Sequence, residues 1–202
     1  MMRLAVFASG SGSNFEAIVE ATRDGRLSGA EVALVVCDKP GAYVLERAAR
    51  LGIDSFVFNP KEYPEKAAFE QEIVQELHRR DVSFVVLAGY MRLVGPVLLS
   101  AYEGKMINLH PSLLPAFMGK DAIGQAFSYG VKITGVTVHF VDAGLDTGPI
   151  IAQEAVPVAP ADTLETLTAR IHGVEHQLLV EAIQDVVAGR LHLEGRIVKR
   201  QA

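Results

Sequence analysis

Two residues suited to acyl-transfer chemistry stand two positions apart in the segment 105–111, which reads KMINLHP. We predict this segment to be a strand closed by proline, and the two-residue period of a strand puts Asn108 and His110 on one face. A carboxamide donates hydrogen bonds without ionising, whereas an imidazole titrates near neutral pH. The pair could therefore stabilise an oxyanion and move a proton. Two hydrogen-bonded residues at a sheet terminus would leave the same pattern.

The segment 142–149, DAGLDTGP, is a loop that could present a carboxylate to this pair. A carboxylate beside His110 would orient the imidazole and favour its protonated form. Spacing alone does not separate Asp142 from Asp146, but we expect Asp146 to be the functional acid and Asp142 to cap the turn. Four histidines without a convergent partner in sequence are expected to be structural or exposed: His78, His139, His176 and His192.

A turn rich in glycine and serine, residues 9–14 (SGSGSN), joins the first predicted strand to the first predicted helix. Glycines let the backbone approach an anion, helix N-terminal N–H groups point toward it, and serine hydroxyls add donors, so the turn suits a phosphate. A tight turn with a helix cap explains the same residues. The third glycine of a dinucleotide fingerprint falls at Phe15 and no Walker lysine follows, which favours a monophosphate. Asp38, where a ribose-binding acid would stand, keeps a dinucleotide open.

The elements that must position these residues alternate along the chain. Short apolar runs predict buried strands, and apolar residues with helical spacing lie between them. The order predicts an α/β fold, with a Rossmann-like, mostly parallel sheet, helices on both faces and an antiparallel strand pair in the C-terminal half. The predicted strands are 3–8, 30–36, 54–58, 82–88, 105–111, 132–141 and 149–158. After the helix that follows the glycine turn, the predicted helices are 42–51, 64–80 and one from the N-cap Asp162 to Gly189, followed by a hairpin or tail over 190–199.

Composition narrows the class of protein. A chain of 202 residues that is 50% apolar and 21% charged fits one folded domain. A net charge of −5 without a basic block argues against a nucleic-acid partner. The single cysteine, Cys37, excludes an internal disulfide, and no Cys/His spacing resembles a zinc site, so we expect no metal. No apolar run has the length of a membrane span or a signal segment, which predicts a cytoplasmic protein without a membrane partner.

Four segments together resemble the phosphoribosylglycinamide formyltransferase family. They are GSGSN at 10–14, VVLAGYMRLV at 85–94, INLHPSLLP at 107–115 and GVTVHFVDAGLDTGPII at 135–151, and the resemblance spans nearly the whole chain. It implies that the amine of glycinamide ribonucleotide attacks the formyl carbon of the co-substrate 10-formyltetrahydrofolate, in purine (IMP) biosynthesis and without a metal. It also implies one formyltransferase domain, 1–202, with a ribonucleotide-phosphate-binding half (1–100) and a catalytic and folate-binding half (101–202).

The resemblance assigns roles position by position. Asn108 and His110 would stabilise the tetrahedral oxyanion, with His110 as the proton donor and Asp146 holding it. The residues implied to bind glycinamide ribonucleotide are Gly12, Ser13, Asn14 and Glu175. The residues implied to bind the formyl folate are Lys66, Met91, Arg92, Leu93, Val94 and Asn108. From its own pattern, Glu175 shares a helical face with His172 and would meet ligand or solvent.

Other functions stay open alongside this one. Methionyl-tRNA formyltransferase and formyltetrahydrofolate deformylase usually carry an extra domain for which we expect no room here, but a deformylase-like hydrolase remains the alternative within the superfamily. A nucleotide-binding oxidoreductase or sensor is the alternative from another class. The chain also departs from the family pattern, with Met118 in place of a proline and Leu179–Val180 in place of a Tyr-Pro pair, so we expect a less rigid 115–121 loop and an unkinked long helix. The sequence leaves a homodimer open.

Overall fold

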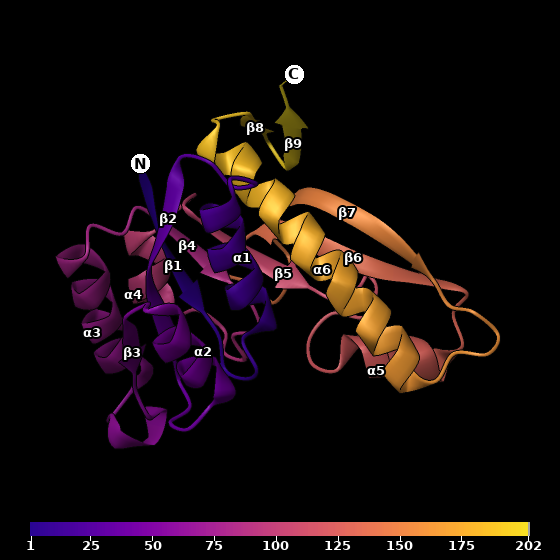
Figure 1. Cartoon of the computed structure of the whole chain (residues 1–202), viewed down its shortest axis with the longest axis horizontal. Coiled ribbons are helices and arrows are strands. Elements are labelled where there is room, and N and C mark those ends of the chain that lie inside the picture. Colours follow the sequence, from indigo (N-terminus) through magenta and orange to yellow (C-terminus); the bar gives the residue numbers. More distant parts are fainter. Residues whose placement is uncertain (202) are drawn as a thin grey trace. The chain divides into compact units, whose positions relative to one another are not determined.

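A computed structural model describes residues 1–201 and divides the chain into two compact units, Met1–Ile107 and Asn108–Ala202 (Figure 1). The first unit contains a sheet in the strand order β3-β2-β1-β4-β5. β1 pairs in parallel with β2 and β4, and β2 pairs in parallel with β3. The strands are β1 (Met2–Phe7), β2 (Ala30–Cys37), β3 (Ser55–Val57), β4 (Phe84–Leu87) and β5 (Met106–His110), which crosses into the second unit.

The helices of the first unit form two pairs. α1 packs against α2 and β2, whereas α3 packs against α4. Right-handed crossovers put the pair α1 and α2 on one face of the parallel strands and the pair α3 and α4 on the other (Figure 1). The helices are α1 (Ser13–Asp24), α2 (Tyr43–Leu51), α3 (Lys66–Arg79) and α4 (Pro96–Ala101), with a 3₁₀ turn at Pro60–Glu62. The predicted helix 64–80 is therefore shorter at both ends, and α4 went unpredicted because six residues carry too little periodicity.

The second unit contains the antiparallel strand pair that the sequence predicts. The end of β5 is followed in strand order by β6 (Ile133–Phe140) and β7 (Ile150–Pro157), which pair in antiparallel fashion. α5 (Ala122–Tyr129) and the 24-residue α6 (Leu164–Val187) complete this part, and α6 packs against α5, β6 and β7. The predicted terminal hairpin is confirmed as β8 (Leu191–Glu194) paired with β9 (Ile197–Arg200).

The predicted N-cap of α6 is wrong by one residue. Thr163 caps the helix, because its Oγ accepts from the backbone N–H of Thr166 while the Thr166 side chain accepts from the N–H of Thr163. The carboxylate of Asp162 instead accepts two hydrogen bonds from Arg170, at 2.7 and 2.9 Å. α6 then continues through Leu179–Val180, which are buried, as an unbroken helix.

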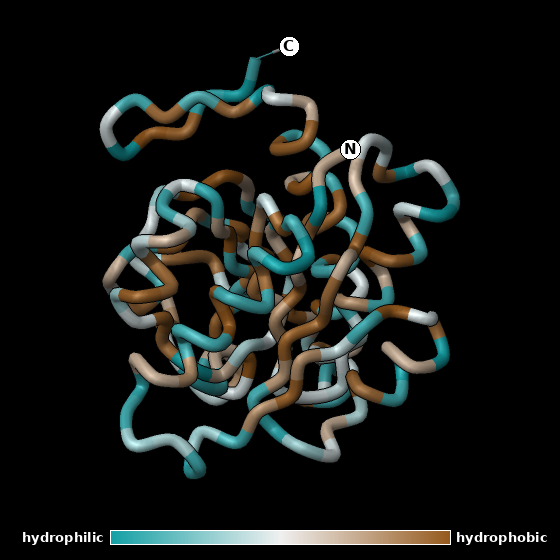
Figure 2. The backbone as a smooth tube through the Cα atoms, turned by 90° about the vertical axis from the view of Figure 1, so that its left-hand side faces the viewer, coloured by the Kyte–Doolittle hydropathy of each residue, from teal (hydrophilic) through white to brown (hydrophobic). Residues whose placement is uncertain are grey.

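The apolar runs become the core of each unit. In Figure 2 hydrophobic stretches run through the middle of the traced backbone, and hydrophilic stretches gather on loops that project outward. β4 is buried along its whole length, as expected for a strand covered on both faces. The predicted α/β class, mostly parallel with an antiparallel pair, is confirmed. Among residues 1–201, no helix is long and apolar enough to cross a membrane.

Candidate active site

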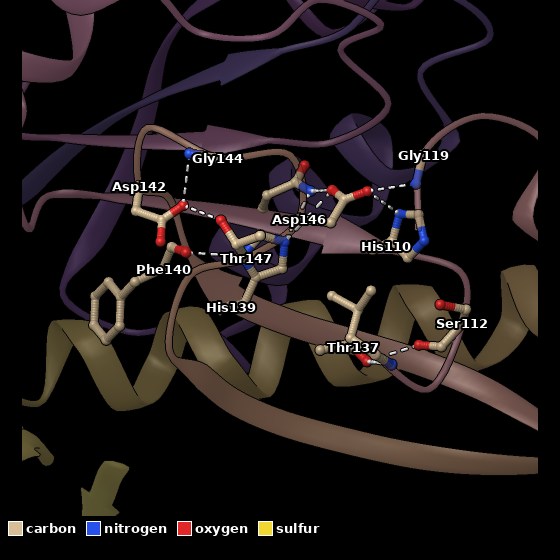
Figure 3. Close-up of polar contacts among 12 residues, drawn as sticks. His110, Ser112, Gly119, Thr137, His139, Phe140, Asp142, Gly144, Asp146 and Thr147 are labelled. Atoms are coloured by element: carbon tan, nitrogen blue, oxygen red, sulfur yellow. Dashed lines mark hydrogen bonds and ion pairs between the residues drawn. The ribbon is translucent and has the colours of Figure 1, made fainter. Parts of the chain in front are cut away.

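The three residues predicted to carry the chemistry meet at the carboxylate of Asp146 in the second unit, and Figure 3 shows His110 beside Asp146. Oδ2 of Asp146 lies 3.4 Å from Nδ1 of His110, and Oδ1 accepts a hydrogen bond of 3.4 Å from Nδ2 of Asn108. The side chains of His110 and Asp146 are only 6% and 10% exposed, so water screens their interaction weakly. Asp146, and not Asp142, is therefore the acid beside His110.

A fourth residue, His139, joins this cluster. Its Nδ1 lies 2.7 Å from the carbonyl oxygen of Phe140, which can only accept, so Nδ1 carries the proton. Nε2 is then an acceptor and takes a hydrogen bond of 3.1 Å from Nδ2 of Asn108. Burial lowers the pKa of His139, which keeps the ring neutral. The prediction that His139 is structural or exposed did not include this contact with Asn108. The signal that could have found it is the position of His139 in β6, the strand next to β5, which carries Asn108.

His139 and Asp146 together fix the amide of Asn108. Both N–H bonds of its Nδ2 point at acceptors, one at His139 and one at Asp146. The bond to His139 is the shorter of the two. The carboxamide is therefore held in one orientation by a neutral ring, and its weaker bond, to Asp146, is the one more easily exchanged for another acceptor.

The loop that carries Asp146 is built by Asp142. Oδ1 of Asp142 accepts hydrogen bonds from the N–H of Gly144 at 3.0 Å and the hydroxyl of Thr147 at 2.6 Å, so Asp142 caps the turn as predicted (Figure 3). Asp146 itself has φ 53°, a left-handed conformation that is uncommon for residues other than glycine. Its Oδ2 also accepts from the N–H of Gly119 at 2.8 Å. The position of the carboxylate is thus determined from several sides.

The 115–121 loop also holds the other nitrogen of His110. Nε2 lies 2.8 Å from the carbonyl oxygen of Phe117, so Nε2 carries a proton. Phe117 has φ 52°, and the neighbouring Met118 is 37% exposed. Both nitrogens of His110 are consequently occupied, one by a carboxylate and one by a backbone carbonyl.

The glycine turn of the first unit has a conformation that only glycine allows at residue 12. Gly12 has φ 76° and is the N-cap of α1, without a capping side chain. A Cβ at this position would lie 2.4 Å from Cγ2 of Val44. The turn is held by hydrogen bonds from the N–H of Val44 to the carbonyl of Gly10 at 3.0 Å and from Nε of Arg47 to the carbonyl of Ser11 at 2.8 Å. Ser13 and Asn14 begin the helix, with their N–H groups at its positive end.

The segment predicted to bind folate, Met91–Val94, and the residues just after it form hydrogen bonds with side chains of α3 in the first unit. Nζ of Lys66 donates a hydrogen bond of 2.8 Å to the carbonyl of Leu93. One turn later, the buried carboxylate of Glu70 accepts from the N–H of Gly95 at 2.5 Å and from Leu98 at 3.3 Å. The side chains of Met91 and Leu93 are exposed, whereas Val94 is buried.

Two further predicted residues have definite positions. Glu175 is buried in α6, with its Oε2 4.0 Å from Nε2 of His172 on the next turn. Asp38 follows β2 in the first unit, and its carboxylate binds the hydroxyl of Ser9 and the guanidinium of Arg92. In the structure Asp38 is therefore occupied by the protein's own side chains, which disfavours its use on a ribose. Among the described residues 1–201, no group of three or more His, Cys, Asp and Glu side chains is arranged so that it could hold a metal ion.

Comparisons with known proteins agree with this arrangement. The formyl transferase family model matches residues 2–183. The chain belongs to this family. It is 56% identical over 187 residues to the phosphoribosylglycinamide formyltransferase of Bacillus subtilis, covering 93% of this chain and 95% of that protein. It is also similar to two solved structures of glycinamide ribonucleotide transformylase 1: that of Symbiobacterium toebii (48% identical, TM-score 0.96, 100% and 95% of the chains covered) and that of Geobacillus kaustophilus (62%, 0.90, 93% and 99%).

The similarity to known formyltransferases bears on the alternative functions that the sequence left open. Coverage of 95% of the Bacillus subtilis protein means that the two chains correspond almost end to end. The match to formyl transferases covers most of the chain, so it disfavours the oxidoreductase and sensor alternatives, which depended on Asp38 and the glycine turn.

Proposed function

We propose that this formyltransferase transfers the formyl group of 10-formyltetrahydrofolate to the amine of glycinamide ribonucleotide, in de novo purine biosynthesis. The products are formylglycinamide ribonucleotide and tetrahydrofolate. The observation that carries the proposal is the carboxylate of Asp146, which is shared between the amide of Asn108 and the imidazole of His110. In a family of formyl transferases, this set supplies a neutral oxyanion donor and a proton carrier at one point.

Asn108 and His110 divide the chemistry between them in this proposal. As the amine adds to the formyl carbon, negative charge develops on the formyl oxygen, and Nδ2 of Asn108 exchanges its 3.4 Å bond to Asp146 for that oxygen. His110, which Asp146 orients, then supplies a proton to the folate nitrogen as the bond from that nitrogen to the formyl carbon breaks, and the proton that the amine loses replaces the one that His110 has given up. Nε2 can donate its proton only after its hydrogen bond to the carbonyl of Phe117 breaks.

The glycine turn and Glu175 are the proposed contacts of the ribonucleotide. The N–H groups that open α1 at Ser13 and Asn14 suit a phosphate, since the N-terminus of a helix attracts anions. Gly12 allows the turn to pack directly against Val44, where a side chain at residue 12 would clash. A buried carboxylate at Glu175 suits the ammonium or amide end of glycinamide.

The Met91–Val94 segment, with Lys66, is the proposed site of the formyl folate, and Asn108 contacts its formyl group. The exposed side chains of Met91 and Leu93 offer an apolar surface to a flat ring, and the backbone between them offers donors and acceptors. The formyl folate supplies the carbon that is transferred, so the residues around it need only bind and orient it. The assignment of residues 1–100 and 101–202 to separate halves stays a prediction.

The compartment and the assembly also remain predictions. The lone cysteine, Cys37, is buried, and burial raises the pKa of its thiol, which suits a reducing cytoplasm in which no disulfide forms. Sedimentation of the purified protein would decide between a monomer and the homodimer that the sequence leaves open.

One assay tests the function directly. Purified protein is mixed with a chromophoric 10-formyl folate, with and without glycinamide ribonucleotide, and loss of the formyl group is followed by absorbance. We expect turnover only when the amine is present. Equal turnover without the amine would identify a deformylase, and no turnover together with NAD binding would favour the oxidoreductase.

A further inference from the structure

Asp38 lies at the junction of three chain segments in the first unit. Its Oδ1 accepts a hydrogen bond of 2.5 Å from the hydroxyl of Ser9, which follows β1. Its Oδ2 accepts one of 2.7 Å from Nε of Arg92, which follows β4. The Asp38 side chain is only 8% exposed, whereas that of Arg92 is 38% exposed, so the carboxylate is the shielded partner of this ion pair.

The hydroxyl of Ser9 extends this junction to the backbone of the predicted folate segment. Ser9 Oγ accepts a hydrogen bond of 2.9 Å from the N–H of Met91 while donating its own proton to Asp38. Asp38 therefore fixes two consecutive residues, Met91 through Ser9 and Arg92 directly. Lys66 and Glu70 hold the other end of the segment. Loss of Asp38 would free the Arg92 side chain and remove the acceptor that orients the Ser9 hydroxyl, and with it the acceptor of the Met91 N–H.

The glycine turn has anchors that do not include Asp38. The carbonyl of Gly10 is held by the N–H of Val44, and the carbonyl of Ser11 by Nε of Arg47. Arg47 also forms an ion pair with Glu16 of α1. Asp38 thus binds only the first residue of the turn, Ser9, whereas Gly10 and Ser11 are held by α2.

We propose that Asp38 is a positioning residue for the formyl folate, which sets the backbone of residues 91–92 through Ser9 and Arg92 and leaves the ribonucleotide turn unaffected. The proposal rests on the proposed function, because it takes residues 91–94 as the folate segment. It gives Asp38 a role different from the ribose contact that its position at the end of β2 suggests.

The test separates the two substrates. For Asp38→Ala we expect the KM and the Kd for the chromophoric 10-formyl folate to rise about tenfold, while kcat and the KM for glycinamide ribonucleotide change by less than about twofold. Asp38→Asn keeps one acceptor and should show a smaller rise. Arg92→Gln breaks the same ion pair by removing its other partner. In the double variant Asp38→Ala/Arg92→Gln, the folate KM should be at most about twofold higher than in Asp38→Ala, because both substitutions remove one interaction.

Two matched variants sharpen the result. Arg47→Gln should raise the KM for glycinamide ribonucleotide and leave the folate KM unchanged, the reverse of Asp38→Ala. Asp24→Asn removes an exposed aspartate that pairs with Arg26 in the same unit and should change neither constant. Circular dichroism and thermal unfolding of each variant report folding. If Asp38→Ala does not fold, Asp38→Asn and Arg92→Gln carry the test.

Unchanged folate constants in all three variants at the junction would overturn the proposal, and so would equal rises for both substrates. Failure of the proposed function is distinguishable, because the Kd for the folate is measured by fluorescence titration without turnover. A wild-type protein that binds the folate but transfers no formyl group would contradict the function, and its Asp38 variants would still decide the role of Asp38.

Discussion

The 91–95 segment of the first unit and the Asp146 cluster of the second are held in opposite ways. In the segment, the side chains of Lys66 and Glu70 hold backbone groups, and Asp38 holds the side chains of Ser9 and Arg92. In the cluster, backbone groups such as the N–H of Gly119 hold side chains. The 91–95 segment can therefore bind a ligand through a backbone that is held in place. The Asp146 cluster can carry out chemistry through side chains that are held in place. Substitutions should therefore change affinity or stability in the first and turnover in the second.

The largest effect should come from Asn108, because it is the only amide donor in the cluster. Asn108→Ala should lower kcat by about 10² to 10³, the usual cost of removing an oxyanion donor, with a much smaller change in either KM. Steady-state kinetics with the chromophoric folate measures it. Asn59→Ala, which removes a partly exposed asparagine from the turn before α3, is the matched control and should retain the wild-type kcat. A wild-type kcat for Asn108→Ala would break the contrast between the two regions.

Glu70 should show the opposite behaviour. Glutamine has one acceptor oxygen, so Glu70→Gln sets an amide NH₂ against the N–H of Gly95 or of Leu98 in a buried site. We expect the free energy of unfolding to fall by about 1–3 kcal/mol and kcat to stay within about twofold. Urea unfolding followed by circular dichroism measures the first and the formyl-transfer assay the second.

The control for Glu70 lies on the same helix. Glu72 is exposed and accepts from the hydroxyl of Tyr63, so Glu72→Gln should change stability by less than about 0.5 kcal/mol. Equal losses in Glu70→Gln and Glu72→Gln would show that the buried contacts of Glu70 do not hold the segment.

The smallest effect concerns pH and His139. Burial lowers the pKa of this ring in the folded protein, so below about pH 6.5 the unfolded chain binds a proton that the folded chain does not. Stability should therefore fall as the pH drops below about 6.5, with a contribution from this residue of at most about 1.4 kcal/mol per pH unit. His139→Gln keeps an acceptor for Asn108 and removes this titration.

The comparison of slopes isolates His139 from the other ionisable groups that face it, which are His110, Asp142 and Asp146. Urea unfolding of both proteins between about pH 7 and 5.5 should give a shallower pH dependence for His139→Gln. Parallel curves would mean that the ring is already protonated in the folded state and does not accept from Asn108.

Much of the fold and part of the site follow from sequence patterns. The period of two placed Asn108 and His110 together, and the turn-forming residues of 142–149 indicated a loop that presents an acid. Apolar runs located the strands because strands covered on both faces need no polar alternation. The hydrogen bonds from Gly144 and Thr147 to Asp142 were predictable because they join residues at most five positions apart in the sequence.

The parts that escaped prediction depend on contacts between distant residues. His139 lies 31 positions from Asn108, and only the pairing of strands brings the two together. α4 is fixed by Glu70, 25 positions before the N–H of Gly95 that it binds. The acid at Asp38 suggested a ribose contact by position, and only the structure shows that Arg92, 54 residues later, occupies it.

Gly148 illustrates how packing alone can close a position to change. A Cβ there would lie 1.7 Å from the carbonyl oxygen of Phe140, the same oxygen that accepts the proton of His139 Nδ1. Every other amino acid would push this carbonyl away from the ring it orients. In a map of mutational tolerance, residue 148 would therefore look as essential as a reacting group, although it has no functional group to offer, and its intolerance would record the space taken by one oxygen atom.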